Sequence, residues 1–374
     1  MIVRRGRARE EMNALSFFYD SSLSFMNGIN WFGMETASQC LGGLWKNSVE
    51  WYVEGLRSQG WDAIRVPLSA KSVLENPVLP ETCYAGDGIL MQFWNPLTYH
   101  NLLLYLFTVC EGKDIKLLLD VHRILPGQST PLWYIPGDPQ WTFYRLWEVY
   151  DRLLSDARYF DSVAFLGIDL FNEPHGEATF GTNDPLTDWR LFSQETIRYL
   201  VDRYDKEKEE EGESGSPSPS FLIFINGIDW GKNFSGYADH PYDVGDNDNY
   251  YVSGKNDVAS LLLSHVQWSP HLYGPSLNTI ASFDPRVLYS YWDELFGTVF
   301  PPSHIWIGEW GGRFDNPDDL RWMTLFREYM NRDRRFRGQF FWALNPDSQD
   351  VDGILDSEWS MWNHTRIQFI LHSS

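Results

Sequence analysis

The feature that most constrains the fold is the alternation of eight short apolar runs with longer amphipathic segments. The runs are continuously apolar, as expected of strands that are buried on both faces of a parallel sheet. They cover residues 28–33, 63–68, 115–122, 164–173, 221–227, 265–273, 304–311 and 338–345. Eight strands, each followed by a helix, is the number found in a (β/α)8 barrel. A doubly wound sheet would need a glycine-rich phosphate loop after its first strand, and "GINWFGMET" from Gly28 has none. We therefore predict a single-domain α/β protein, a (β/α)8 TIM barrel.

The segments between the runs show helical patterns with recognisable ends. Gly60 and Gly112 are good helix stops, and Pro96 suits a first helical turn. Helices are expected at residues 44–60, 95–112, 141–158, 187–208, 257–263, 285–296, 317–331 and 360–371.

Two segments lie outside this rhythm. Residues 1–24 form a basic N-terminal extension without an apolar core segment, so no signal peptide is visible, and the barrel itself should span residues 25–374. Residues 204–220, "YDKEKEEEGESGSPSPS", form an acidic insertion with a Gly/Ser/Pro tail that cannot pack. We expect a solvated loop there, without a function of its own.

The carboxyl ends of barrel strands converge on one face, where active sites form. These ends carry polar or aromatic groups, namely Arg65, His122, Asn172, Glu173, His271, Tyr273, Glu309 and Trp342. Glu173 and Glu309 are the notable pair, because glycoside hydrolysis needs one protonated and one ionised carboxyl group beside the scissile bond. Close carboxylates cannot both ionise easily, which raises one of the two pKa values. Other interpretations stay open: solvated charges for the glutamates, a structural ion pair for Arg65, and core packing for the histidines and Trp342.

Charge and aromatic content indicate the kind of ligand. The net charge of −21 argues against binding to nucleic acid or to an anionic membrane surface, since both attract cationic proteins. Eighteen tryptophans are more than a core needs, and surplus Trp commonly stacks on flat ligands such as sugars. The histidines show no H-E-x-x-H spacing, so we expect neither a metal nor a cofactor. We also expect a monomer.

Several motifs, in order along the chain, resemble glycoside hydrolase family 5, the cellulase family of the retaining barrel glycosidases. They are "INWFGMET", "AIRVPL", "LLLDVHR", "LFNEP", "DWGKNFSG", "HLYGP", "IGEWGG" and "FFWALNPDSQDVDGIL". The resemblance implies that Glu173 is the acid/base and Glu309 the nucleophile. It implies that Asn172 bonds the sugar 2-hydroxyl, that Arg65 and Tyr273 stabilise Glu309, that His122 and His271 bind substrate or orient the carboxylates, and that Trp342 stacks beneath a sugar.

The same resemblance implies an endo-β-1,4-glucanase that acts on cellulose-type glucans by double displacement and is secreted. Alternatives keep the mechanism but change the polymer to mannan, xyloglucan or mixed-linkage β-glucan. A barrel that only binds polysaccharide is a further alternative, against which the intact pair of carboxylates speaks.

Some features leave two interpretations open. Trp133, Tyr134 and Trp230 lie in expected mouth loops, where they would either line outer sugar subsites or pack ordinarily. Trp310 follows Glu309 where Phe or Tyr is common in such enzymes, and its bulk is a candidate for narrowing the cleft. Cys40 and Cys83 either pair or stay free, and Asn233 and Asn363 stand in glycosylation sequons.

Overall fold

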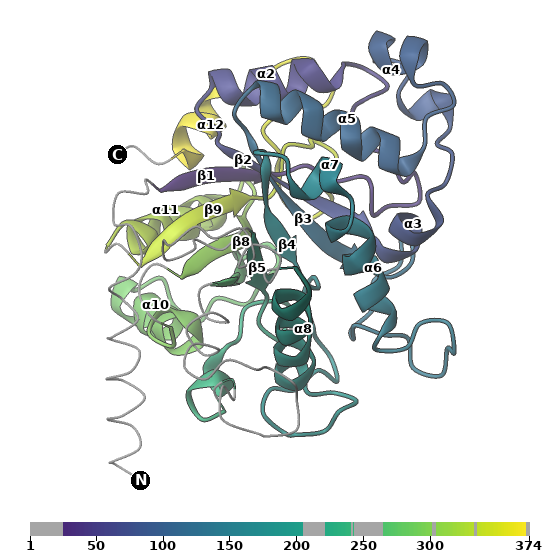
Figure 1. The fold of residues 1–374 in the computed structure, drawn as a ribbon. Coiled ribbons are helices and arrows are strands. Elements are labelled where there is room, and N and C mark those ends of the chain that lie inside the picture. Colours follow the sequence, from purple (N-terminus) through teal and green to yellow (C-terminus); the bar gives the residue numbers. More distant parts are fainter. Residues whose placement is uncertain are drawn as a thin grey trace, which may run out of the picture.

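The strands of the computed structural model form one closed parallel barrel with the helices around it (Figure 1). The structure describes residues 25–204, 221–240, 242, 265–300, 304–332 and 335–371. The strands are β1 Met26–Asn30, β2 Ala63–Ser69, β3 Lys116–Arg123, β4 Phe165–Asp169, β5 Leu222–Ile225, β6 Val266–Trp268, β7 His271–Tyr273, β8 Ile305–Gly311 and β9 Phe336–Phe341. Their order is β6-β5-β4-β3-β2-β1-β9-β8-β7, and a pairing of β6 with β8 closes the ring. The predicted TIM barrel is confirmed.

The predicted sixth strand, 265–273, consists of two pieces. β6 pairs with β5, and β7 pairs with β8, with Ser269 and Pro270 between the two pieces. Proline has no backbone N–H to donate to a ladder, which accounts for the break. The eight barrel positions are therefore filled by nine strands. The break matters for the site because β7 sets His271 in register with Glu309 of β8.

The helices follow the predicted pattern, with shifted ends. They are α2 Val49–Ser58, α3 Ala70–Glu75, α4 Gly88–Phe93, α5 Tyr99–Gly112, α6 Arg145–Leu154, α7 Ala157–Phe160, α8 Trp189–Tyr204, α10 Pro285–Trp292, α11 Pro317–Asn331 and α12 His364–Ile370. The helix expected over 44–60 begins only at Val49, because Ser48 caps it by accepting from the backbone N–H of Trp51. The segment 141–158 contains two helices, since Asp156 caps a separate α7. A π-helical turn, Asp293–Gly297, continues α10.

Two short helices between β2 and α5 were not predicted. α3 begins at the cap Ser69 and α4 at the cap Asp87. Each has six residues, too few to produce a helical periodicity in the sequence. The extension 1–24, the insertion from residue 205 to 220 and the helix expected at 257–263 lie outside the described residues.

The barrel interior is built in two layers. The lower layer is an apolar cluster of Ala63, Leu118, Phe224, Trp306 and Phe340. Successive strand side chains alternate between the inside and the outside, so the inward residue two positions further along lies one layer higher. On three strands these next positions hold Arg65, Asp120 and Asn226. The alternation therefore places polar groups directly above the apolar layer, at the carboxyl end of the barrel. The larger hydrophobic core lies between strands and helices.

A disulfide joins Cys40, in the loop after β1, to Cys83, in the 3-10 turn Glu81–Cys83. This resolves the open question about these two cysteines. Cys110 is a buried free thiol on α5. In the described part of the chain, no helix combines the length and the apolar character that a membrane span requires.

Candidate active site

The structure brings the residues predicted from the strand ends together at one mouth of the barrel. Hydrogen bonds link five of them into one set, namely Arg65, Glu309, Tyr273, Asn172 and His122. His271 hydrogen-bonds Glu173 and lies 3.6 Å from Glu309, which places this second pair against the first set. Trp342 joins the set by stacking along the ring of His122. The eight predicted side chains thus occupy a single site.

Arg65 is the centre of this set. Its side chain is fully buried, and its Nη1 donates to Glu309 Oε1 at 2.6 Å. Its Nη2 lies 3.0 Å from Asp169 Oδ2 and 3.1 Å from Asp120 Oδ2. One guanidinium therefore contacts three carboxyl groups from three different strands. A buried charge without partners would be prohibitively costly, so these contacts explain why an arginine can stand inside the barrel.

Four residues of the site were missed in the sequence. Asp120 and Asp169 bind Arg65; Asn30 Oδ1 accepts from Arg65 Nη1 at 3.0 Å; and Asn226 donates to Asp169. Burial raises the pKa of Asp120 and of Asp169 to about 7 against the opposing attraction of Arg65. In the sequence, all four are polar residues inside runs that are otherwise apolar, and they come before the ends of the predicted strands. Arg65 inside an apolar strand is itself an indication that carboxyl groups lie across the barrel, because a buried guanidinium needs such partners.

Glu309 is held by donors on both carboxylate oxygens. Arg65 binds Oε1, and the Tyr273 hydroxyl donates to Oε2 at 2.5 Å. Burial raises the pKa of Glu309, while Arg65, His122 and Tyr273 pull the pKa back down. These contacts stabilise the ionised form and fix the direction of the carboxylate.

Glu173 has a different environment, in which no cationic side chain of the described residues contacts its carboxyl group directly. Burial first, and then the negative charge of Glu309, raise the pKa of Glu173 well above its usual value. Its backbone has a positive φ of 51° and is fixed from both sides, since Asn226 Oδ1 accepts from its N–H at 3.0 Å and His175 Nδ1 donates to its carbonyl at 2.7 Å. Such a conformation in a non-glycine residue commonly marks a functional position.

His271 lies between the two carboxyl groups. Its Nδ1 is 3.0 Å from Glu173 Oε1 and 3.6 Å from Glu309 Oε2. Burial and the positive charge of Arg65 lower the pKa of His271 well below its usual value, so the imidazole is neutral at neutral pH. With a single Nδ1 proton to share, His271 orients the glutamates without adding charge.

The two glutamates are close neighbours. One oxygen from each, together with a nitrogen of His271, lie within 4.8 Å of one another. This spacing fits the roughly 5–5.5 Å of retaining glycosidases and is below the roughly 6.5–9.5 Å of inverting ones. Within the described residues these three groups are also the one set whose spacing would suit a metal ion. The guanidinium of Arg65 on Glu309 disfavours a second cation there.

His122, Asn172 and Trp342 form the adjoining wall. His122 Nδ1 donates to Asp120 at 2.6 Å, and burial lowers the pKa of His122 to about 4, which keeps the ring neutral. Asn172 accepts from Arg65 through Oδ1, while its Nδ2 faces His122 Nε2 at 3.4 Å. The rings of Phe32 and Trp342 stack with an interplanar angle of 6°. Trp342 is 9% exposed, so a narrow part of it reaches the mouth.

The structure separates the tryptophans whose roles were open. Trp230 is 52% exposed and stacks on His175 beside Glu173, as a mouth residue would. Trp133 is fully buried against Trp189 and Phe192, so it packs ordinarily. Trp310 was a candidate for narrowing the cleft, and that expectation was wrong. Its ring is fully buried against Phe326 of α11 and Phe341, because the strand turns the residue after Glu309 outward.

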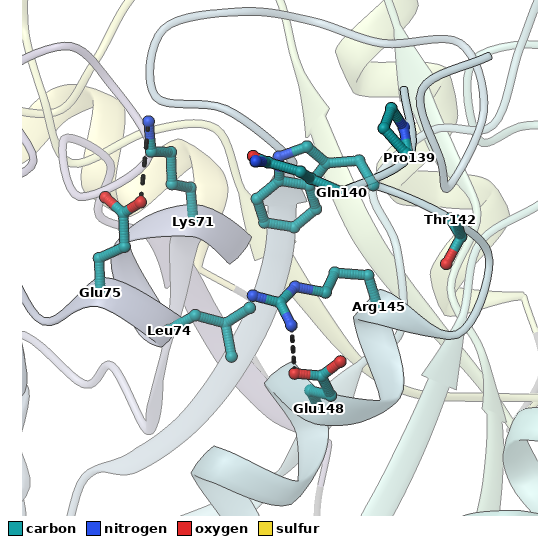
Figure 2. Close-up of a pocket in the computed structure, with 9 residues that line it drawn as sticks. Lys71, Leu74, Glu75, Pro139, Gln140, Thr142, Arg145 and Glu148 are labelled. Atoms are coloured by element: carbon teal, nitrogen blue, oxygen red, sulfur yellow. Dashed lines mark hydrogen bonds and ion pairs between the residues drawn. The ribbon is translucent and has the colours of Figure 1, made fainter. Parts of the chain in front are cut away.

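A separate hollow of about 400 Å³ lies among α3, the loop before α6 and α6 itself (Figure 2). Its charged side chains pair with each other, Lys71 with Glu75 and Arg145 with Glu148. None of the residues predicted for the active site lines it.

Comparison with known proteins identifies relatives of this arrangement. Residues 23–348 match the family model described as cellulase (glycosyl hydrolase family 5). An endoglucanase of Paenibacillus polymyxa is 28% identical, over 91% of this chain and 80% of its own length. The major extracellular endoglucanase of Xanthomonas campestris pv. campestris is 26% identical, over 90% of this chain but 64% of its own length. The fold matches that of a Pyrococcus horikoshii endocellulase solved with cellotetraose, at a TM-score of 0.75 and 24% identity, covering 93% of this chain and 92% of that one.

Proposed function

Because the chain belongs to glycosyl hydrolase family 5, we propose that it is an endoglucanase that cleaves internal β-1,4-glucosidic bonds of cellulose-type glucans with retention of configuration. The observation that carries this proposal is the pair Glu173 and Glu309, which share His271 and lie at retaining distance. The names of the relatives support glucan as the substrate.

In the first step, a Glu309 oxygen attacks the anomeric carbon, and the bond from that carbon to the leaving oxygen breaks. Glu173 gives its proton to the leaving oxygen. The contacts of Arg65 and Tyr273 with Glu309 support its role as the ionised nucleophile. The strongly raised pKa of Glu173 supports its role as the acid.

In the second step, water attacks the anomeric carbon of the glycosyl-enzyme ester. Glu173, now a carboxylate, takes the proton of the water, and Glu309 leaves as a carboxylate. While Glu173 is ionised, the Nδ1–H of His271 stabilises its carboxylate by a hydrogen bond, and the imidazole keeps its proton throughout. Both residues then return to their starting states.

The remaining site residues take supporting roles in this proposal. Asn172 binds the sugar 2-hydroxyl through the amide that faces His122, and this bond strengthens as the transition state forms. Trp342 stacks beneath the sugar at the cleaved bond, and Trp230 offers a stacking surface further out. A barrel that only bound polysaccharide would have no need of Arg65 and Tyr273 on one carboxylate, which supports catalysis.

The test is a product-resolved assay on cellopentaose beside mannopentaose. We expect cellopentaose to yield two- and three-unit products, and Glu309→Gln to abolish the reaction. Cleavage of mannopentaose alone would keep the mechanism and refute the substrate. Equal activity in wild type and Glu309→Gln would refute the role of Glu309.

A second assay tests Glu173. Glu173→Ala should lose most activity on cello-oligosaccharides, but retain it better on an aryl cellobioside whose leaving group needs little protonation. Equal losses on both substrates would contradict the acid/base assignment.

We also propose that the protein works outside the cell. The Cys40–Cys83 disulfide is typical of an oxidising compartment, and one relative is named an extracellular enzyme. Activity confined to the intracellular fraction of the source organism would contradict this.

A further inference from the structure

The aromatic pair of His175 and Trp230 lies beside the acid/base candidate and has no part in the chemistry described above. The ring centroids are 3.5 Å apart and the planes differ by 13°, so the imidazole covers one face of the indole. Since 52% of Trp230 is nevertheless exposed, the indole also presents surface to solvent.

The backbone at Trp230 has an unfavourable conformation that directs the indole ring toward solvent. Asp229 and Trp230 have φ angles of 58° and 61° in a tight turn, closed by backbone pairing of Gly227 with Gly231 and of Ile228 with Asn233. Positive φ is unfavourable for residues with a side chain, and especially so for a bulky one. Strain of this kind persists at functional positions.

The turn is also locked against the catalytic centre. At Gly231 a Cβ atom would lie 2.8 Å from Cγ of His271, so the backbone passes directly over the imidazole that bridges the two glutamates. Trp230 is therefore fixed near Glu173.

His175 has a defined orientation. Its Nδ1 lies 2.7 Å from the Glu173 carbonyl oxygen, which can only accept, so Nδ1 carries the proton. Its own backbone N–H donates to the carbonyl of Pro131 at 3.0 Å, which anchors this loop to the loop after β3. The imidazole thus connects the acid/base backbone to the exposed indole.

From this geometry we propose that His175 is a positioning residue that holds Trp230 as the stacking surface for the sugar on the leaving-group side, and thereby sets how often a sugar, rather than water, attacks the glycosyl-enzyme. The inference rests on the proposed function. The side follows from Glu173, which protonates the leaving group and is two residues from His175. Aromatic faces bind the apolar faces of sugar rings, so an ordered indole retains a sugar better than a mobile one.

Transfer to a sugar uses the same groups as hydrolysis. The acceptor hydroxyl oxygen forms a bond to the anomeric carbon, the ester bond to Glu309 breaks, and Glu173 takes the hydroxyl proton. Because both reactions need Glu173 as the base, the ratio of transfer to hydrolysis does not depend on its basicity. The ratio reports how well the acceptor sugar is bound and oriented.

The test compares two variants that separate the two contacts of His175, its hydrogen bond to the Glu173 carbonyl and its stacking on Trp230. His175→Asn keeps a donor near the position of Nδ1 but removes the ring, and His175→Phe keeps a ring but removes the donor. The donor substrate is β-cellobiosyl fluoride, whose leaving group has no sugar, and the acceptor is cellobiose at graded concentrations. Released fluoride counts every glycosyl-enzyme formed, and cellotetraose counts those that transfer, so hydrolysis is the difference between the two. Both are measured at early times, before the enzyme cleaves the cellotetraose, and their ratio needs no correction for the rate at which the intermediate forms.

We expect His175→Asn to lower the transfer-to-hydrolysis ratio about three- to tenfold, the range of an aromatic contact. His175→Phe should stay within about twofold of wild type, and Trp230→Ala should define the lower limit. An unchanged ratio in His175→Asn, or an equal fall in His175→Phe, would overturn the proposal. So would a wild-type enzyme that hydrolyses cellotetraose but never transfers to cellobiose. A wild type inactive on every cello-substrate would instead refute the proposed function.

Discussion

At the scale of single residues, the site depends on the different environments of two carboxyl groups. Glu309 has Arg65 and Tyr273 as donors, whereas Glu173 has burial and a negative neighbour. Burial alone would raise both pKa values; the arginine separates them. The arginine therefore favours the ionised form of Glu309, while the surroundings of Glu173 favour its protonated form, which is the difference that the proposed retaining mechanism uses.

Glu173→Gln should stabilise the protein, and more so as pH rises. Glu173 keeps its proton in the folded state to higher pH than in the unfolded chain, so its stabilising contribution is present below the usual glutamate pKa and is lost as pH rises toward the raised one. Glutamine cannot ionise and escapes this loss. We expect the Tm of Glu173→Gln to match wild type near pH 4 and to exceed it at pH 7. A constant Tm difference across this range would contradict the raised pKa.

Gly308→Ala should impair activity through His271. A Cβ at Gly308 would lie 2.7 Å from His271 Nε2 and 2.1 Å from Ser269 Oγ, so the imidazole must shift from its position against the glutamates. A displacement of about 1 Å at a catalytic group costs on the order of 100-fold in rate. Kinetics on cellotetraose measure the effect. Gly112→Ala is the matched control, because a Cβ there meets nothing within 4 Å; equal kinetics in both variants would contradict the expectation.

At the scale of elements, two loops on the mouth of the barrel are joined covalently. The Cys40–Cys83 disulfide spans 43 positions and connects the loop after β1 to the segment that holds α3 and α4. The covalent connection adds a restraint to a segment whose two helices have only six residues each.

Replacing both cysteines by serine should destabilise the fold. A closed loop of this length gives about 4 kcal/mol in the chain-entropy model. Urea unfolding of Cys40→Ser/Cys83→Ser beside wild type measures the difference. A reductant should bring wild type to the level of the variant and leave the variant unchanged. If the reductant destabilised both equally, the effect would not come from this bond.

A feature of this structure could be predicted from the sequence where neighbouring residues determine it, and not where contacts between distant residues do. The continuous apolar runs reflect burial on both faces, so the eight barrel positions were correctly predicted. The strand-end residues lie at one mouth as expected, while the roles of Glu173 and Glu309 stay predictions. Asp120 and Asp169 were missed because a buried charge can be assigned only when its partner across the barrel is known. The exposure of Trp230 and its stacking on His175 depend on a turn with two positive φ angles, which no residue pattern at 229–230 indicates. Trp310 was misjudged because the alternation of the strand was not applied to it.

At the scale of the whole molecule, the net charge of −21 affects the binding of a charged polymeric substrate. A polyanionic substrate is repelled by such a protein, and dissolved salt screens that repulsion over about 10 Å at 0.1 M. A neutral polymer experiences neither effect.

The KM for carboxymethylcellulose should therefore fall as salt rises from about 10 to 200 mM, while the KM for hydroxyethylcellulose should stay nearly constant. Both polymers share the backbone that the site would cleave, so hydroxyethylcellulose controls for effects of salt on the enzyme itself. Parallel changes on the two polymers would argue against long-range repulsion.

The buried contacts of Arg65 have a consequence for how this protein can diverge. Three carboxyl groups from three strands contact one guanidinium, so replacing Arg65 leaves all three buried without their cation. A single substitution at Arg65 would therefore not be tolerated, and only simultaneous replacement of Arg65 and its partners would be viable. Among the described residues, the exposed side chain of Trp230 has no buried ionic partner, although the backbone of its turn is held against His271. In a mutational library selected for activity on a new polysaccharide, we expect many functional variants with substitutions in the loops at the mouth. We expect almost none with substitutions at Arg65 and its partners.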